Sequence, residues 1–135
     1  MIDLSYSGAI EVFDDEETSK VYRARIEKLL SFPNTQYKEP LTLKSLKEAI
    51  EKRRRGHIQS NVLLVGRQGL IDLHMSKEFV DYFDPVTKLE RIHLGYVGSM
   101  FGMSVQSDVY LLNLEQPILD VDSYYLVTLP FGYQD

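Results

Sequence analysis

Three histidines, His57, His74 and His93, are the residues best suited to metal binding and to acid–base catalysis. They lie 17 and 19 residues apart, and none has a second histidine four positions away, the spacing with which one helical face binds zinc. Asp72 and Glu78 lie near His74 in the sequence, but no metal-binding motif joins them. The absence of cysteine excludes thiolate zinc sites, disulfides and cysteine nucleophiles. We therefore expect no metal site and no cofactor.

Three other short motifs are incomplete versions of known catalytic or binding patterns. Residues 66–69 (GRQG) follow an apolar run, where phosphate loops begin, but they lack the Gly-Lys-Ser/Thr ending and predict a plain turn. Ser99 lacks the G-x-S-x-G context of a nucleophile elbow. Asp120 and Asp122 lack the glycine and the closing glutamate of an EF-hand loop, which favours a turn. We predict no catalytic residue, no small-molecule substrate and no enzymatic activity.

Arg53, Arg54 and Arg55 form the one charged run that suggests a binding function. Two interpretations remain open. The cations stabilise the negative end of a helix dipole on a solvated face, or they contact nucleic acid or an acidic partner, such as residues 14–17 of another subunit. The net charge of −5 argues against a general nucleic-acid binder but allows a local basic patch.

Length and composition are those of an ordinary globular domain. The chain has 135 residues, of which 44% are hydrophobic and 26% charged, enough for one domain with its own core. No apolar run reaches the roughly 18 residues that span a membrane. Residues 1–4 have neither the basic nor the apolar part of a signal peptide. We therefore expect no membrane contact, and synthesis in a cytoplasm.

Two helices are predicted in the first half of the chain. The acidic residues 14–17 favour a helix N-terminus, and apolar residues recur with helical spacing as far as Ser31, so the first helix covers residues 15–31. Residues 34–40 predict a polar connection. Thr42 predicts the N-cap of a second helix, whose apolar stripe lies on one face, and Gly56 predicts its C′ residue.

The remaining segments predict a sheet. Residues 62–65 are apolar and β-branched, as in a central strand covered on both faces. Residues 70–75 fit a strand or a helix, whereas residues 76–83 predict a short helix. Residues 104–112 alternate, with the valines and Leu111 inward, and precede a loop at 113–122 and a last strand at 124–129.

This order of elements predicts an α+β fold, a mixed β-sheet with packed helices. We expect five residues to be buried together: Leu46, Ile50, Val62, Leu64 and Val105.

Residues 88–132 contain a passage in which Gly95, Gly98 and Gly102 lead into an alternating strand that ends in Ser107 and Asp108. This passage resembles the C-terminal part of tailed-bacteriophage major capsid proteins of the Hong Kong 97-type coat fold. The resemblance covers residues 41–135 and implies the axial domain of such a protein, preceded by an N-terminal arm and helix in residues 1–40. Gly98 and Gly102 are expected to hold the chain in a tight loop that turns it into the strand at 104–112, where a side chain is disfavoured if either glycine has positive φ.

The resemblance implies a virion structural protein, coat-like or capsid-associated, without enzymatic activity. Its partners would be copies of itself or other virion proteins, and its location the virion, after the host cytoplasm. The alternative is a small accessory or regulatory protein that contacts nucleic acid or an acidic partner through Arg53 to Arg55. The candidate interface residues are Arg53, Arg54, Arg55, Tyr96, Gly98, Phe101 and Gly102.

Overall fold

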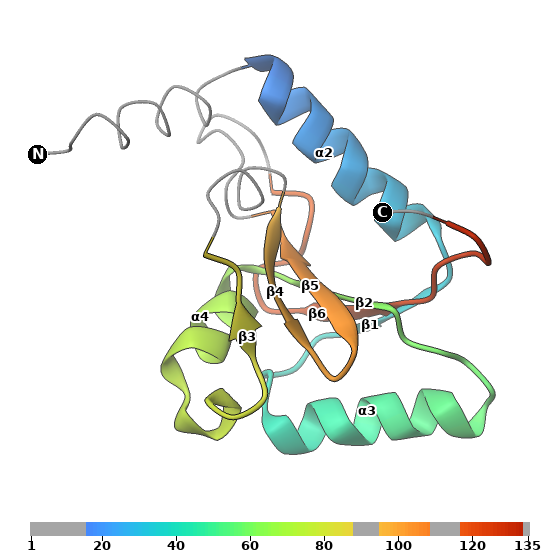
Figure 1. The fold of residues 1–135 in the computed structure, drawn as a ribbon, viewed down its shortest axis with the longest axis vertical. Helices are drawn as coiled ribbons and strands as arrows, with labels where there is room; N and C mark the ends of the chain where they lie inside the picture. The colour runs from blue at the N-terminus through green and yellow to red at the C-terminus, as the bar shows by residue number, and fades with distance from the viewer. Residues whose placement is uncertain (1–15, 88–94, 109–116, 134–135) are drawn as a thin grey trace, which may run out of the picture.

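The computed structural model describes residues 16–87, 95–108 and 117–133 (Figure 1). Within these ranges the chain forms one six-stranded mixed sheet with helices on both faces, so the predicted α+β fold class is confirmed. The helices are α2 (Glu16–Ser31), α3 (Leu43–Arg55), α4 (Arg67–Met75) and the short 3-10 helix η1 (Lys77–Phe79). The strands are β1 (Asn34–Tyr37), β2 (Val62–Val65), β3 (Asp84–Pro85), β4 (Tyr96–Met100), β5 (Met103–Ser107) and β6 (Tyr124–Val127).

The sheet has the strand order β1-β6-β2-β5-β4-β3. β2 runs parallel to β5 and antiparallel to β6, and the other neighbouring pairs are antiparallel. All four residues of β2 are buried, which confirms the prediction of a central strand covered on both faces. β1 and β6 pair across the predicted boundary at residue 40, so residues from both sides of that boundary contribute to one sheet.

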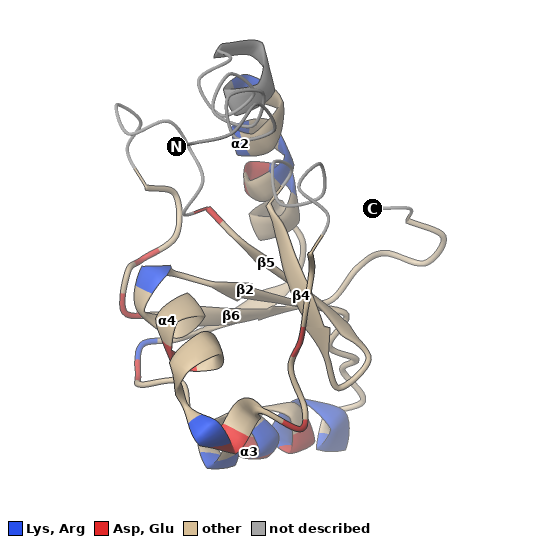
Figure 2. Cartoon of the chain, turned by 60° about the vertical axis from the view of Figure 1, so that its left-hand side comes forward, with Lys and Arg blue, Asp and Glu red and all other residues tan. Residues whose placement is uncertain are grey.

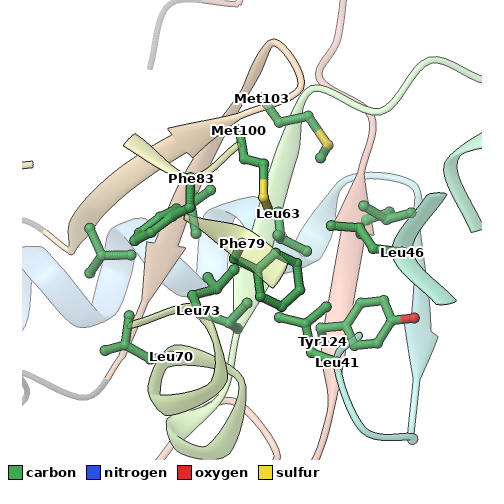
Figure 3. Packing of buried hydrophobic residues seen from close by; sticks show 14 of the residues in the cluster. Leu41, Leu46, Leu63, Leu70, Leu73, Phe79, Phe83, Met100, Met103 and Tyr124 are labelled. Carbon is green, nitrogen blue, oxygen red and sulfur yellow. The ribbon is translucent and has the colours of Figure 1, made fainter. Parts of the chain in front are cut away.

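Two hydrophobic cores lie on opposite faces of the sheet. α3, α4 and η1 cover one face, where Phe79 lies among Leu63, Leu73 and Tyr124 (Figure 3). α2 covers the other face with Tyr22, Ile26 and Leu29. The expectation of one shared core was wrong in this respect. Successive side chains of β2 point to opposite faces, and those of Val62 and Leu64 lie in the core under α2. Leu46 and Val105 lie in the other core, and Ile50 is only partly buried beside it.

α3 begins and ends with hydrogen-bonded caps. The Oγ1 atom of Thr42 accepts from the backbone N of Ser45, and the Ser45 Oγ accepts from the backbone N of Thr42, which confirms Thr42 as the N-cap. At the other end Gly56 has φ −85°, whereas His57 has φ 61°. His57, and not Gly56, is therefore the left-handed C′ residue. The N–H of Ile58 donates to the carbonyl of Arg53, as in a Schellman motif.

Residues 34–40 were predicted as a polar connection, and this was wrong for β1. Its four residues pair with β6 in the register Asn34↔Val127 to Tyr37↔Tyr124. An edge strand needs only one partner for its backbone, and its outer side chains face water, so it carries no hydrophobic alternation. The polar sequence NTQY is compatible with that position.

The undecided segment 70–75 is helical, as part of α4. The plain turn predicted at residues 66–69 was wrong beyond Gly66, because the helix begins at Arg67. The helix predicted over residues 76–83 was also too long, since only η1 forms there and the chain turns into β3 before Pro85. Phe79 and Phe83 are buried all the same, which explains the apolar spacing that suggested a helix.

The C-terminal third differs from the prediction mainly at its glycines. Gly98 lies inside β4, so the tight loop expected there was wrong, whereas Gly102 follows β4 at the tip of a hairpin. β5 ends at Ser107, and its burial does not alternate, because Gln106, Ser107 and Asp108 are also buried. The predicted inward positions Val109 and Leu111 lie outside the described residues, as does most of the loop predicted at 113–122. The last strand is β6, two residues shorter than predicted.

Candidate interaction site

The three arginines at the end of α3 do not share one surface. Arg53 is only 6% exposed, whereas Arg54 and Arg55 are exposed and both pair with Glu51. Helical geometry separates neighbours by about 100°, so one arginine of a consecutive run turns inward. The part of the predicted patch that a partner could reach consists of Arg54 and Arg55.

The Arg53 side chain links three segments near one edge of the sheet. Its Nη1 donates to Oγ1 of Thr35 at 2.6 Å, its Nη2 donates to Oγ1 of Thr128 at 2.6 Å, and its Nε donates to Oγ of Ser60 at 3.0 Å. Burial lowers the pKa of Arg53 from its ordinary value, because the guanidinium loses water. Three neutral hydroxyls replace that water, and the arrangement gives Arg53 a structural role.

The hairpin between β4 and β5 places an aromatic ring in a conformation that side chains rarely adopt. Met100 pairs with Met103, and the two residues between them, Phe101 and Gly102, have φ of 54° and 77°. Two positive φ values define a type I′ turn, for which Asn-Gly is the usual sequence. Gly102 therefore lies in a tight turn, as predicted, and its φ is positive. The conformational cost at Phe101 is not offset by full burial of the ring, since the residue is 40% exposed.

Basic and aromatic residues surround this turn. The ring of Tyr82, 42% exposed, lies 5.3 Å from that of Phe101, and Nζ of Lys47 lies 4.9 Å from the Tyr82 centroid. A groove of about 470 Å³ beside Phe101 is also lined by Arg54, His57 and Ile58. We call these six residues the basic-aromatic patch: Lys47, Arg54, His57, Ile58, Tyr82 and Phe101. Figure 2 shows that basic residues recur along α3, whereas β2 and β6 carry no charged residue.

The other two predicted interface residues lie elsewhere. The guanidinium of Arg25 stacks on the ring of Tyr96 at 3.9 Å, on the side of the sheet that α2 covers. Gly98 packs against Phe83, and a Cβ on Gly98 would lie 2.4 Å from Cε1 of that ring. Gly98 is therefore required by packing. Neither Tyr96 nor Gly98 belongs to the basic-aromatic patch.

A second hollow lies where the ends of β1, β6 and α4 meet. It has a volume of about 530 Å³, and we call it the acidic cleft. Its lining residues are Lys38, Glu39, Pro40, Leu41, Gln68, Gly69, Asp72, Asp122, Ser123 and Tyr124. Three of these carry carboxylates, and the one cation, Lys38, already pairs with Asp120 at 3.5 Å.

Tyr124 lines the acidic cleft, and Asp120 lies beside it as the partner of the lining residue Lys38. The Tyr124 ring stacks on Tyr37 at 5.1 Å, and burial raises the pKa of its hydroxyl to about 12, so this hydroxyl stays protonated. The Asp120 carboxylate accepts from the backbone N of Asp122 and from Oγ of Ser123. The N–H of Asp122 lowers the pKa of Asp120. The predicted turn role of Asp120 is thereby confirmed.

The helix start after β2 does not hold an open phosphate loop. A Cβ on Gly66 would lie 2.1 Å from the carbonyl oxygen of Asp120, and the backbone N of Gln68 donates to the carbonyl of Val121. The segment around residues 120–123 therefore occupies the place that a bound phosphate would need.

Among the residues that the structure describes, Asp108 is the one buried acid, at 6% exposure. One oxygen, Oδ2, accepts from the backbone N atoms of Ile118 and Leu119, both at 2.7 Å. Burial raises the pKa of Asp108, although these two hydrogen bonds act in the opposite direction. Raised carboxyl pKa values are common in active sites, but here the carboxylate binds backbone groups and acts as a tie between β5 and residues 118–119.

The histidines are not brought together in the part of the chain that the structure describes. His57 is the C′ residue that follows α3, the His74 ring contacts the Phe83 ring edge-on at 5.3 Å, and His93 lies outside the described residues. Among the described residues, no three His, Asp or Glu side chains are placed to hold a metal ion. None of the described helices is both long and apolar enough to cross a membrane.

Comparisons with known proteins add no relative to these observations. No protein-family model matches the chain, and neither a curated protein nor a solved structure does.

Sequence reasoning missed Lys47, Tyr82 and the acidic cleft. Lys47 and Tyr82 are far from Phe101 in the sequence, and only the packing of α3 and η1 against the hairpin joins them. The cleft combines three separate segments. One local signal was present, since the pair Phe101-Gly102 between Met100 and Met103 is compatible with a two-residue hairpin turn.

Proposed function

We propose that this chain is a coat-like or capsid-associated structural protein of a phage particle, and that it works by packing against copies of itself or other virion proteins without catalysis. The phage setting rests on the resemblance of residues 41–135 to coat axial domains. Of the segments on which the resemblance rests, α3, β2, β5 and β6 form a helix and strands as expected, whereas residues 95–102 hold the strand β4 and its hairpin turn. Because fold alone does not determine function, the proposal needs a surface that a partner would cover.

Phe101 is the observation that carries the proposal. A bulky residue in the left-handed region costs roughly 1–2 kcal/mol relative to a favoured conformation. Here that cost is not offset by full burial, and the ring lies beside a second exposed ring, that of Tyr82. Strain of this kind concentrates at functional positions. Exposed aromatic pairs with a cation nearby are typical of the centre of a protein interface.

The test is the substitution Phe101→Asn. Asparagine is favoured at the first central position of a type I′ turn, so the variant should unfold at a urea concentration equal to or higher than the wild type. If Phe101 serves packing between subunits, the same variant should weaken self-association by about tenfold or more, because the anchor ring is lost. Sedimentation over a range of concentrations, with and without candidate coat partners, measures the association.

Phe131→Asn is the matched control, since Phe131 is fully exposed and lies outside the basic-aromatic patch. This control should leave association unchanged. A wild-type chain that remains a monomer at all concentrations and with all partners would contradict the proposal. A Phe101→Asn variant that loses stability but keeps association would show that the ring serves the fold alone.

The structure leaves fewer arginines for the alternative function, contact with nucleic acid. Arg53 is buried, and Arg54 and Arg55 share Glu51, so the exposed run offers less positive charge than three free arginines would. Binding to single-stranded DNA that falls steeply with salt and disappears in Arg54→Gln/Arg55→Gln would favour this alternative over subunit packing.

A further inference from the structure

The charge of this molecule is unevenly distributed along one helix. α3 contains six Lys or Arg residues and two Glu, a net charge of +4, in a chain of net charge −5. The rest of the chain therefore carries −9. Arg53 is the one buried cation of α3, and the other five are exposed. A basic surface on an acidic protein is complementary to other surfaces of the same protein.

The acidic cleft lies at the N-terminal end of α3, whereas the groove of the basic-aromatic patch lies at the C-terminal end, with Lys47 between them. Leu41 of the cleft directly precedes the N-cap Thr42, and Tyr124 donates to Oγ of Ser45 in the first turn of the helix. Arg54 and His57 of the patch lie at the C-terminal end. A helix of 13 residues is about 20 Å long. The two surfaces are therefore separate and both open to a neighbouring molecule.

We propose that the basic-aromatic patch of one copy docks against the acidic cleft of a second copy. This inference rests on the proposed function, because it identifies the surfaces through which copies pack. The same junction forms twice in a two-fold pair or once per subunit in a ring, depending on the rotation between copies.

The chemistry of the two surfaces is complementary. The carboxylates of Glu39 and Asp122 are exposed at the cleft. The Arg54 guanidinium pairs with Glu51 of its own helix through Nη2, but it is exposed and has further N–H groups that can donate to carboxylates. Between the charges the cleft offers apolar surface from Pro40, Leu41 and Tyr124, against which the ring of Phe101 can be buried. Lys38 does not oppose an incoming cation, because Asp120 pairs with it.

Salt provides the first test of this arrangement. Exposed charges are screened over about 10 Å at 0.1 M ionic strength. Association between wild-type copies should therefore weaken by about tenfold or more when NaCl is raised from about 0.05 M to about 0.5 M. Association that strengthens with salt would indicate a purely apolar contact and would overturn the inference.

Charge reversal on each side provides the decisive test. The patch variant is Lys47→Glu/Arg54→Glu, and the cleft variant is Glu39→Lys/Asp122→Lys. Each should associate about a hundredfold more weakly than the wild type, because like charges then face each other. An equal mixture of the two should recover association, since every junction between the two variants again joins opposite charges. Sedimentation of each variant and of the mixture measures this.

Two controls separate docking from folding. Lys44→Glu/Lys52→Glu makes the same charge change on exposed residues of α3 outside the patch, and it should leave association within about twofold of the wild type. Urea unfolding checks that each variant is folded. If charge reversal destabilises α3, Lys47→Gln/Arg54→Gln replaces the patch variant and should weaken association by about tenfold.

The outcomes distinguish this inference from the proposed function. A wild-type chain that never associates contradicts both. Association that persists in the cleft variant contradicts this inference alone, since copies then pack through other surfaces. A mixture that fails to recover shows that the patch and the cleft do not meet. Binding of single-stranded DNA that is lost in the patch variant, with self-association unchanged, would assign the patch to nucleic acid and overturn the inference.

Discussion

Nη1 of Arg53 donates a 2.6 Å hydrogen bond to Oγ1 of Thr35, and this contact joins the last turn of α3 to the edge strand β1. The two residues are 18 positions apart in the sequence. The same guanidinium also reaches Thr128, directly after β6, so one side chain holds the edge of the sheet to the helix. Arg53 therefore differs in kind from its neighbours Arg54 and Arg55, which pair with Glu51 on the surface.

We predict that Arg53→Gln lowers the free energy of unfolding by about 2–4 kcal/mol, because hydrogen bonds from a buried charged group are lost and Thr35 is left without this donor. The matched substitutions Arg54→Gln and Arg55→Gln should each cost about 1 kcal/mol or less, as exposed ion pairs do. Urea unfolding monitored by circular dichroism measures all three. Equal losses at the three positions would contradict the assignment of Arg53 as the structural arginine.

Gly98 and Gly102 should respond to alanine for different reasons. At Gly98 a Cβ would lie 2.6 Å from the carbonyl oxygen of Asp84, so Gly98→Ala should cost about 1–3 kcal/mol through overpacking. At Gly102 a Cβ has nothing within 4 Å, and only the φ of 77° opposes it, so Gly102→Ala should cost about 1 kcal/mol. Thermal unfolding compares the two. A further substitution, Phe83→Leu, should recover part of the Gly98→Ala loss and none of the Gly102→Ala loss.

The elements that were predicted correctly are those whose signals are local. Thr42 caps α3 through a residue three positions away, and the apolar run of β2 is buried on both faces in the observed sheet. The errors arose where long-range packing decides. β1 has no hydrophobic alternation because it lies at an edge. Gly98 is part of the strand β4, and glycine is needed there because Phe83, 15 positions earlier, fills the space that a side chain would occupy.

The candidate site was only partly predictable for a related reason. Phe101 and Gly102 were candidates, and their turn conformation follows from two adjacent residues. Arg53 was grouped with the surface because charge runs are usually solvated, but the helical repeat turns it toward the hydroxyls of Thr35 and Thr128. These partners come from sequence positions on both sides of α3, which no local pattern connects.

Leu64 tests the central position of β2. Its side chain is fully buried in the core under α2, with Ile26 and Leu29 in the same cluster. Leu64→Ala should lower the free energy of unfolding by about 2–5 kcal/mol, because the substitution removes buried surface and leaves a cavity. Ile71→Ala is a suitable control, since Ile71 is an exposed apolar residue of α4 and should cost less than about 1 kcal/mol. A loss below about 0.5 kcal/mol at Leu64 would contradict a central β2.

Asp108 should make the stability of the fold depend on pH. Its pKa is raised in the folded protein by burial, with the hydrogen bonds from the N–H groups of Leu119 and Ile118 and the charge of Arg23 acting in the opposite direction. Between the ordinary carboxyl pKa of about 3.9 and this raised value, the folded state binds more protons than the unfolded state. The contribution of Asp108 is therefore full below the ordinary pKa and is lost as pH rises through the folded pKa.

Asp108→Asn keeps an oxygen that can accept from the N atoms of Ile118 and Leu119 but cannot titrate. The wild type should consequently gain stability relative to Asp108→Asn as the pH is lowered from 7 toward 4, in urea unfolding at each pH. Asp108→Ala should lose about 1–3 kcal/mol for each buried N–H that is left unpaired, at every pH. If the stability difference between wild type and Asp108→Asn stays constant with pH, the Asp108 carboxyl has the same pKa in the folded and the unfolded protein. That result would contradict a pKa raised by burial.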